Sequence, residues 1–153
     1  MNLISKILLP DNILIDTEST SKKRVFERVG LLFENNQQIA RSQVFDSLFA
    51  REKLGSTGLG QGVAIPHGRI AKLRDATAAF VKTLHPIPFD APDGQPVNLV
   101  FVLLVPEKAT DLHLQILGEL AQMFSETQFR NRLLACEDSF SIYQLFSDWN
   151  SPA

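Results

Sequence analysis

The organisation of the chain depends on residues 51–69, which read Arg51-Glu52-Lys53-Leu54-Gly55-Ser56-Thr57-Gly58-Leu59-Gly60-Gln61-Gly62-Val63-Ala64-Ile65-Pro66-His67-Gly68-Arg69. Five of the eight glycines of the chain lie in this stretch. Glycine is used where the backbone takes a positive φ or approaches another group closely, so the stretch predicts a tight loop. The apolar run that follows ends at Pro66, which fixes its own φ and favours extended geometry at Ile65. We therefore expect His67 to stand at a rigid strand end, facing the loop.

This loop offers backbone amides and the hydroxyls of Ser56 and Thr57, which are groups that bind an anion. Two known phosphate-binding patterns are absent, because neither Gly-x-x-x-x-Gly-Lys-Ser/Thr nor a complete Gly-x-Gly-x-x-Gly occurs. On spacing alone, a plain crossover loop with a hydrogen-bonded histidine explains the stretch as well as an anion site does.

Two blocks of the stretch carry a family resemblance. Residues 51–58 and 62–68 together resemble the signature of EIIA domains of the mannitol/fructose class, which belong to the bacterial phosphoenolpyruvate-dependent phosphotransferase system. The resemblance covers nearly the whole chain. The sequence of residues 62–69 is most similar to the nitrogen-regulatory branch of these EIIA domains. It implies one EIIA domain over residues 1–153 and no cofactor.

Composition excludes several classes of protein. A chain of 153 residues with 44% hydrophobic and 21% charged residues is typical of one soluble globular domain. The net charge of −2 argues against direct binding to nucleic acid or to an anionic membrane, which basic proteins favour. The longest apolar run, 99–105, is far too short to span a bilayer, and the N-terminus lacks a basic start, so we expect a cytoplasmic protein. Cys136 is alone, which excludes an internal disulfide and predicts a packing role.

Hydrophobic patterns predict a mixed sheet, mostly buried, with helices on both faces. The run Val97–Val105, ended by Pro106, is nearly all apolar, which is typical of a strand covered on both sides. Further strands are expected over 12–15, 62–65 and 76–84, with a short piece at 87–89 and a turn at 93–94. The fold class is therefore α/β.

Five helices are expected from apolar stripes and capping residues. The first follows Ser19, Thr20 or Ser21 and stops at Asn35-Asn36. The second starts at Ser42, carries Arg51 near its end and uses Gly55 as its C-terminal cap. The third begins at Thr110 or Asp111 with a stripe through His113, Leu117, Leu120 and Phe124. A capping box at Ser125 opens the fourth, through about Ala135, and Asp138 or Ser139 opens the last.

The three histidines receive separate interpretations. His67 has the motif, and His113 lies in the first turn of a helix after a buried strand, so both follow strand ends where α/β folds bind ligands. A core histidine on an apolar stripe is the alternative for His113. The resemblance implies instead that His113 sits beside His67 and stabilises a phosphoryl group. His85 precedes Pro86 in an expected turn and is expected to be exposed.

A neutral imidazole is a competent nucleophile towards phosphorus near pH 7, because its ordinary pKa is ~6.5. Positioning and charge stabilisation then remain for the protein to supply. Arg51 suits this role because its planar fork pairs with phosphate oxygens, although a solvated cation at a helix end explains it too. Arg69 is a weaker candidate, and Ser56, Thr57 and Gly58 are expected to form the phosphate loop. The resemblance implies that Nε2 of His67 takes the phosphoryl group.

By resemblance the chain is a phosphoryl carrier: it accepts phosphate from an HPr-type carrier on His67 and regulates target proteins through its phosphorylation state. The runner-up is a free-standing fructose- or mannitol-type EIIA that passes phosphate to an EIIB. Two other classes stay open. His67, His85 and His113 could bind a catalytic zinc with Asp111 nearby, although none has short ligand spacing. A binding module without chemistry is the other.

Overall fold

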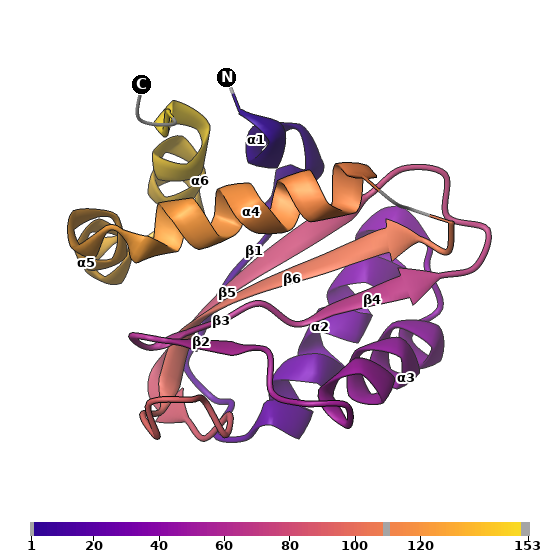
Figure 1. Cartoon of the computed structure of the whole chain (residues 1–153), viewed down its shortest axis with the longest axis horizontal. Coiled ribbons are helices and arrows are strands. Elements are labelled where there is room, and N and C mark those ends of the chain that lie inside the picture. The colour runs from indigo at the N-terminus through magenta and orange to yellow at the C-terminus, as the bar shows by residue number, and fades with distance from the viewer. Residues whose placement is uncertain (1, 109–110, 151–153) are drawn as a thin grey trace.

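The apolar run singled out in the sequence forms β6 (Val97–Pro106), and the rest of the sheet is arranged around it. Figure 1 shows the computed structural model, which describes residues 2–108 and 111–150. The other strands are β1 (Leu8–Asp16), β2 (Gly58–Gly60), β3 (Val63–Ala64), β4 (His67–Ile70) and β5 (Thr77–Ile87). The helices are α1 (Leu3–Ile7), α2 (Lys22–Gln37), α3 (Arg41–Glu52), α4 (Asp111–Ser125), α5 (Thr127–Ala135) and α6 (Ser139–Asp148).

The sheet is mixed, with the order β1-β5-β6-β3-β2. β5 runs antiparallel to β6, whereas β1 is parallel to β5. β3 and β4 pair with β6 in parallel, one after the other along the same side: Val63 lies opposite Leu99, and His67 lies opposite Leu103. Pro66 separates these two short strands, and its carbonyl accepts the Leu103 N–H at 3.0 Å. The glycine-rich stretch is thereby fastened to the central strand on both sides of the proline.

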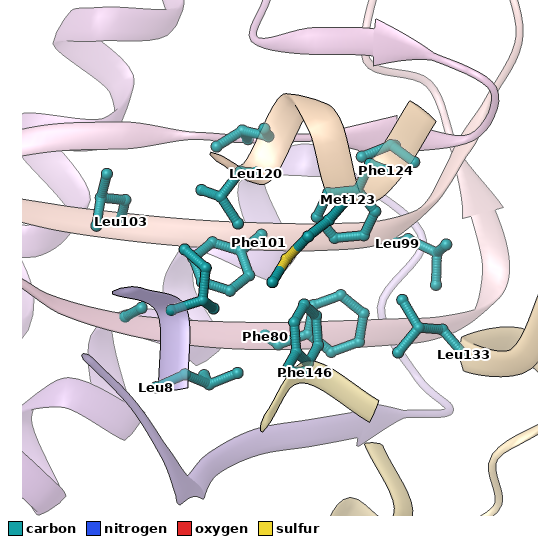
Figure 2. Close-up of a cluster of buried hydrophobic side chains, with 14 of the residues drawn as sticks. Leu8, Phe80, Leu99, Phe101, Leu103, Leu120, Met123, Phe124, Leu133 and Phe146 are labelled. Atoms are coloured by element: carbon teal, nitrogen blue, oxygen red, sulfur yellow. The ribbon is translucent and has the colours of Figure 1, made fainter. Parts of the chain in front are cut away.

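Helices cover both faces of the sheet, as the sequence predicts. α2 and α3 lie on one face, and α1, α4, α5 and α6 lie on the other (Figure 1). Side chains of β6 alternate between the two cores, because successive residues of a strand point to opposite faces: Leu99, Phe101 and Leu103 belong to one, and Val100, Val102 and Leu104 to the other. Figure 2 shows the first core, in which Phe80 and Phe146 meet edge to face with ring centroids 5.0 Å apart.

The strongest sequence signals are confirmed. β6 covers the predicted strand at 97–105 and includes Pro106 as its last residue. Ser21 caps α2 by accepting the N–H of Arg24, and Asp138 caps α6 by accepting the N–H of Ser141. α4 begins at Asp111, while Thr110, the alternative start, lies outside the described residues.

Several predicted boundaries are wrong. β1 begins at Leu8 instead of at residue 12 and follows a short helix, α1, that carries too few residues to show a period. α2 passes through Asn35-Asn36 and ends at Gln37, where Gln38 takes the left-handed conformation. α3 begins one residue before Ser42. Its last turn closes through hydrogen bonds at Lys53, so Gly55 is not its cap.

Other errors concern strands and a cap in the second half of the chain. The predicted strand over 62–65 is only the two residues of β3, and β2 and β4 on either side of it were not expected. β5 extends through His85 and Pro86, so His85 is exposed on a strand and not in a turn. The capping box at Ser125 does not form, since Glu126 precedes α5 and its side chain makes no capping bond.

Within the described ranges, none of the helices is both long enough and apolar enough to cross a membrane.

Candidate functional site

His67 is the first residue of β4. The sequence suggests that it follows the end of a strand, whereas in the structure it begins one. β4 lies between α3 on one side of the sheet and α4 on the other (Figure 1). The contact with α3 is close at Gly68, where an added Cβ would lie 3.0 Å from the Cβ of Ser47. The Ser47 hydroxyl donates to the Arg69 carbonyl at 3.0 Å. α3 therefore approaches the strand that carries His67 so closely that only glycine fits at position 68.

Both ring nitrogens of His67 have partners. Nδ1 lies 3.0 Å from the carbonyl oxygen of Ile65, and Nε2 lies 3.3 Å from Nε of Arg51. A carbonyl oxygen only accepts and a guanidinium only donates, so Nδ1 carries the proton and Nε2 keeps its lone pair. The arrangement selects one tautomer of a neutral imidazole. Its nucleophilic nitrogen faces a cation.

Arg51 occupies the last turn of α3, where a cation is also favoured by the helix dipole. Its contacts are more specific than that role requires. Nη1 donates to the Gly55 carbonyl at 2.8 Å, while Nε donates to His67. The guanidinium therefore spans from the glycine loop to the imidazole. An anion attached at Nε2 of His67 would arrive beside a planar, charged donor.

The loop residues Ser56, Thr57 and Gly58 lie beside His67, but their polar groups already have partners within the protein. The Ser56 hydroxyl donates to the Phe89 carbonyl and accepts the Gly58 N–H. The Thr57 hydroxyl donates to the Glu52 carboxylate, which also accepts the Thr57 N–H at 3.2 Å. These bonds hold the loop in shape. Together with Arg51, Ile65 and His67, the three loop residues line a cavity of about 210 Å³.

Glu52 supports the site, although the sequence analysis assigned it no role. Its side chain is only 4% exposed, and it forms an ion pair with Lys22 at 2.9 Å in addition to accepting from Thr57. The Lys22 ammonium in turn lies 4.7 Å from the centre of the Phe89 ring. The end of α3, the start of α2 and the loop are thereby joined. The only sequence signal is that Glu52 lies next to Arg51 within the quoted stretch.

His113 reaches the site from the first turn of α4. Its ring lies edge to face against that of His67, with centroids 5.5 Å apart. Its Nε2 is buried and has no hydrogen-bond partner among the described residues. Such a group costs stability unless something supplies a partner. The structure therefore brings together His67, His113 and Arg51, together with the loop.

Burial is the main cause that lowers the pKa of both histidines. At His67, the positive charge of Arg51 also lowers the pKa, while the Ile65 carbonyl and Glu52 partly oppose it. At His113, His67 and Arg69 lower the pKa further. Both rings are consequently held neutral at pH 7, and a neutral ring is the nucleophilic form.

The remaining candidates, Arg69 and His85, make no hydrogen bond to His67, Arg51 or His113 in the part of the chain that the structure describes. Arg69 is exposed and donates to the Glu107 carbonyl at 3.2 Å. His85 lies on β5, which is separated from β4 by β6. In the described part of the chain, no three His, Cys, Asp or Glu side chains are grouped to hold a metal ion. The three-histidine zinc site therefore finds no support in the geometry.

The Nε2 lone pair of the neutral His67 ring is directed at the Arg51 guanidinium, and Nε2 of His113 has no partner among the described residues. Such an arrangement can receive a group that carries negative charge. This is the set needed for phosphoryl transfer, in which positioning and charge stabilisation do most of the work.

Comparison with known proteins points the same way. Residues 6–149 match the family model described as the phosphoenolpyruvate-dependent sugar phosphotransferase system, EIIA 2. The chain is 40% identical over 146 residues to the nitrogen regulatory protein of Pseudomonas aeruginosa, covering 95% of each. It is 28% identical over 145 residues to the fructose-specific EIIABC component of Bacillus subtilis, covering 94% of this chain and 23% of that protein.

A solved structure agrees in both fold and sequence. The crystal structure of nitrogen regulatory protein IIA-Ntr from Neisseria meningitidis superposes with a TM-score of 0.89 at 51% identity, covering 94% of this chain and 99% of that one.

Proposed function

The chain belongs to the EIIA 2 family of the phosphoenolpyruvate-dependent sugar phosphotransferase system, and on this premise we propose that it is a phosphoryl carrier with a regulatory role. It accepts a phosphoryl group on Nε2 of His67 from an HPr-type carrier. The phosphorylated and unphosphorylated forms then act differently on partner proteins. The observation that carries the proposal is the lone pair on Nε2, which faces Arg51 while Nδ1–H is held by Ile65.

Transfer proceeds by attack of Nε2 on the phosphorus atom of the donor phosphohistidine. A P–N bond forms at His67 as the P–N bond of the donor breaks, and its electron pair returns to the donor imidazole. The proton on Nδ1 does not need to move, and it stays hydrogen-bonded to the Ile65 carbonyl. The Arg51 guanidinium, which donates to the lone pair of Nε2 before the reaction, then donates to the phosphoryl oxygens. His113 then donates from its Nε2, which is buried and lacks a partner among the described residues.

Regulation follows from the change in charge. Because the proton on Nδ1 is retained, transfer of the PO3− unit adds one negative charge in all, as a dianionic phosphoryl group attached to a cationic ring. The chain carries a net charge of −2 before modification, so this is a large change at one surface. A partner that contacts the rim of the cavity therefore meets two different potentials. The name of the P. aeruginosa relative supports a regulatory role of this kind.

A second candidate is a sugar-pathway carrier that passes its phosphoryl group to an EIIB. The B. subtilis relative is a fructose-specific component, which keeps this candidate open. Its identity of 28% is lower than the 40% shared with the P. aeruginosa nitrogen regulatory protein, which favours regulation.

The test is transfer of labelled phosphate from phosphoenolpyruvate through purified enzyme I and HPr-type proteins. We expect acid-labile label on the chain, followed by selective capture of partners by one of its two phosphorylation states. Efficient onward transfer to a purified fructose-type EIIB would favour the sugar pathway. Absence of label with every HPr-type donor would contradict both candidates.

A further inference from the structure

A second and larger cavity lies against His113, and the proposed function does not use it. Its volume is about 730 Å³, within the range of roughly 300–1,000 Å³ typical of sites for small molecules. It forms where α1, the connection before β5, the end of β6 and the first turns of α4 meet. His113 lines it, whereas His67 lines the smaller cavity.

The walls of this cavity are mainly apolar. Most of the apolar side chains come from α1, β6 and α4, which are distant in sequence; they include Leu3, Ile7, Val105, Pro106 and Ile116. Val105 and Ile116 are buried and belong to the core on that side of the sheet. An apolar surface of this kind gains free energy when an apolar group replaces water.

The rim of the cavity is cationic. Lys6, Arg74 and Lys108 line it, and none of them makes an ion pair within residues 2–108 and 111–150. Asp75 is the one carboxylate among the described lining residues, and it is exposed. Three cations therefore face one acid around an apolar interior.

We propose that this cavity binds a small organic anion with an apolar body, such as an aryl- or alkyl-carboxylate. The apolar body lies against the wall of α1, β6 and α4, and the carboxylate lies among Lys6, Arg74 and Lys108. An inorganic anion would leave the apolar wall uncovered, and a neutral apolar molecule would leave the cations unpaired. The bound anion contacts His113, whose ring lies 5.5 Å from that of His67. Binding is measured without phosphoryl transfer, so the two proposals can fail separately.

The test is an NMR titration of the full ¹⁵N-labelled chain with 4-phenylbutyrate, compared with its neutral amide. We expect amide shifts confined to residues around Lys6, Arg74 and His113, and tighter binding of the carboxylate. Each exposed cation should contribute about two- to fivefold to the affinity. The triple variant Lys6→Gln, Arg74→Gln and Lys108→Gln should therefore lose roughly 10- to 100-fold and bind acid and amide alike.

The matched control is a triple variant that removes the same charge elsewhere, Lys23→Gln, Lys53→Gln and Arg132→Gln. All three of these residues are exposed and lie outside the cavity. It should bind 4-phenylbutyrate as the wild type does. Equal affinity for the acid and the amide in the wild type would overturn the proposal, as would an equal loss in the two triple variants. Amide shifts that map outside the cavity, for example around the exposed Leu114, would overturn it as well.

Discussion

His67 and His113 come from different elements, and their ring nitrogens differ in whether they have hydrogen-bond partners. His67, on β4, has a partner at each ring nitrogen, and α3 presses on its strand at Gly68. His113, on the first turn of α4, has a buried Nε2 without a partner in the described part of the chain. A nucleophile needs a fixed tautomer and direction, whereas a stabilising donor needs a free hydrogen-bonding group when the phosphoryl group arrives. We therefore propose a different role for each ring.

Replacing His67 should have the largest effect. His67→Gln removes the lone pair that forms the P–N bond, so acid-labile labelling should disappear while the fold persists. His85→Gln is the matched control, since His85 is exposed on β5, and it should label as the wild type does. Label retained in His67→Gln would place the nucleophile elsewhere and end the comparison.

Replacing His113 tests the other half of the comparison. His113→Leu should slow phosphoryl uptake, because a donor to transition-state charge is lost; about 100- to 1,000-fold is an upper guide from oxyanion sites. The free energy of unfolding should stay constant or rise slightly, since a buried group without a partner is removed. The measurements are a labelling time course and a urea titration. A large loss of stability with an unchanged rate would instead identify a core histidine.

Arg51→Lys sharpens the comparison on the His67 side. Lysine keeps the charge at the end of α3 but cannot fork onto two phosphoryl oxygens. We expect labelling to slow by about tenfold, equivalent to one hydrogen bond, with little change in melting temperature. Arg41→Lys, at the other end of the same helix, is the control and should react normally. Equal rates for Arg51→Lys and the wild type would reduce Arg51 to a helix-end cation.

Glu52→Gln tests whether the His67 side depends on its supporting network. The amide can still accept from Thr57, but Lys22 loses its carboxylate. Since Lys22 stays partly exposed and keeps its contact with Phe89, we expect a loss of about 2 kcal/mol in the free energy of unfolding. Glu27→Gln, which breaks a more exposed pair, should change it by less than about 1 kcal/mol. Labelling should slow only a few-fold.

The smallest expected effect concerns pH. Both histidines have pKa values below the ordinary 6.5, chiefly through burial, so the unfolded chain binds protons more readily than the folded chain does. Their stabilising contribution is complete above pH 6.5 and is lost as the pH falls towards the folded pKa values. The labelling rate should therefore stay level down to pH 6.5 and decline below it. A midpoint at or above 6.5 would contradict the lowered pKa of His67.

A double variant separates the histidines from the other groups that titrate in acid. His67→Gln with His113→Gln should lose less stability than the wild type between pH 7 and pH 5.5, measured by urea unfolding. Equal losses in the two proteins would show that neither ring has a lowered pKa in the folded state.

The sequence predicts well where one residue type or one strong period decides the structure. The apolar run of β6 and the capping residue Asp138 are examples, because each acts on its own neighbours. β4 was not predicted, since its four residues are held by a partner strand more than thirty positions away. α1 was missed because five residues show no helical period.

The site follows the same rule. Residues 51, 56–58 and 67 lie close together in the sequence, and they line one cavity. His113 was placed beside them by family resemblance, because its approach depends on how α4 crosses the sheet. Glu52 was overlooked because its role depends on Lys22, which lies thirty residues earlier and comes close only after α2 and α3 pack together.

The contact between Gly68 and Ser47 links the evolution of these two positions. Any side chain at position 68 would push α3, and with it Arg51, away from His67. The nearest atom to an added Cβ is the Oγ of Ser47, so Ser47→Ala would relieve most of the overlap and leave the Ser47 Cβ at 3.0 Å. Alanine at position 47 would also remove the hydroxyl that donates to the Arg69 carbonyl. Each single change is thus harmful and the pair only partly compensates, so a lineage that carries Gly68 has no easy mutational path away from it.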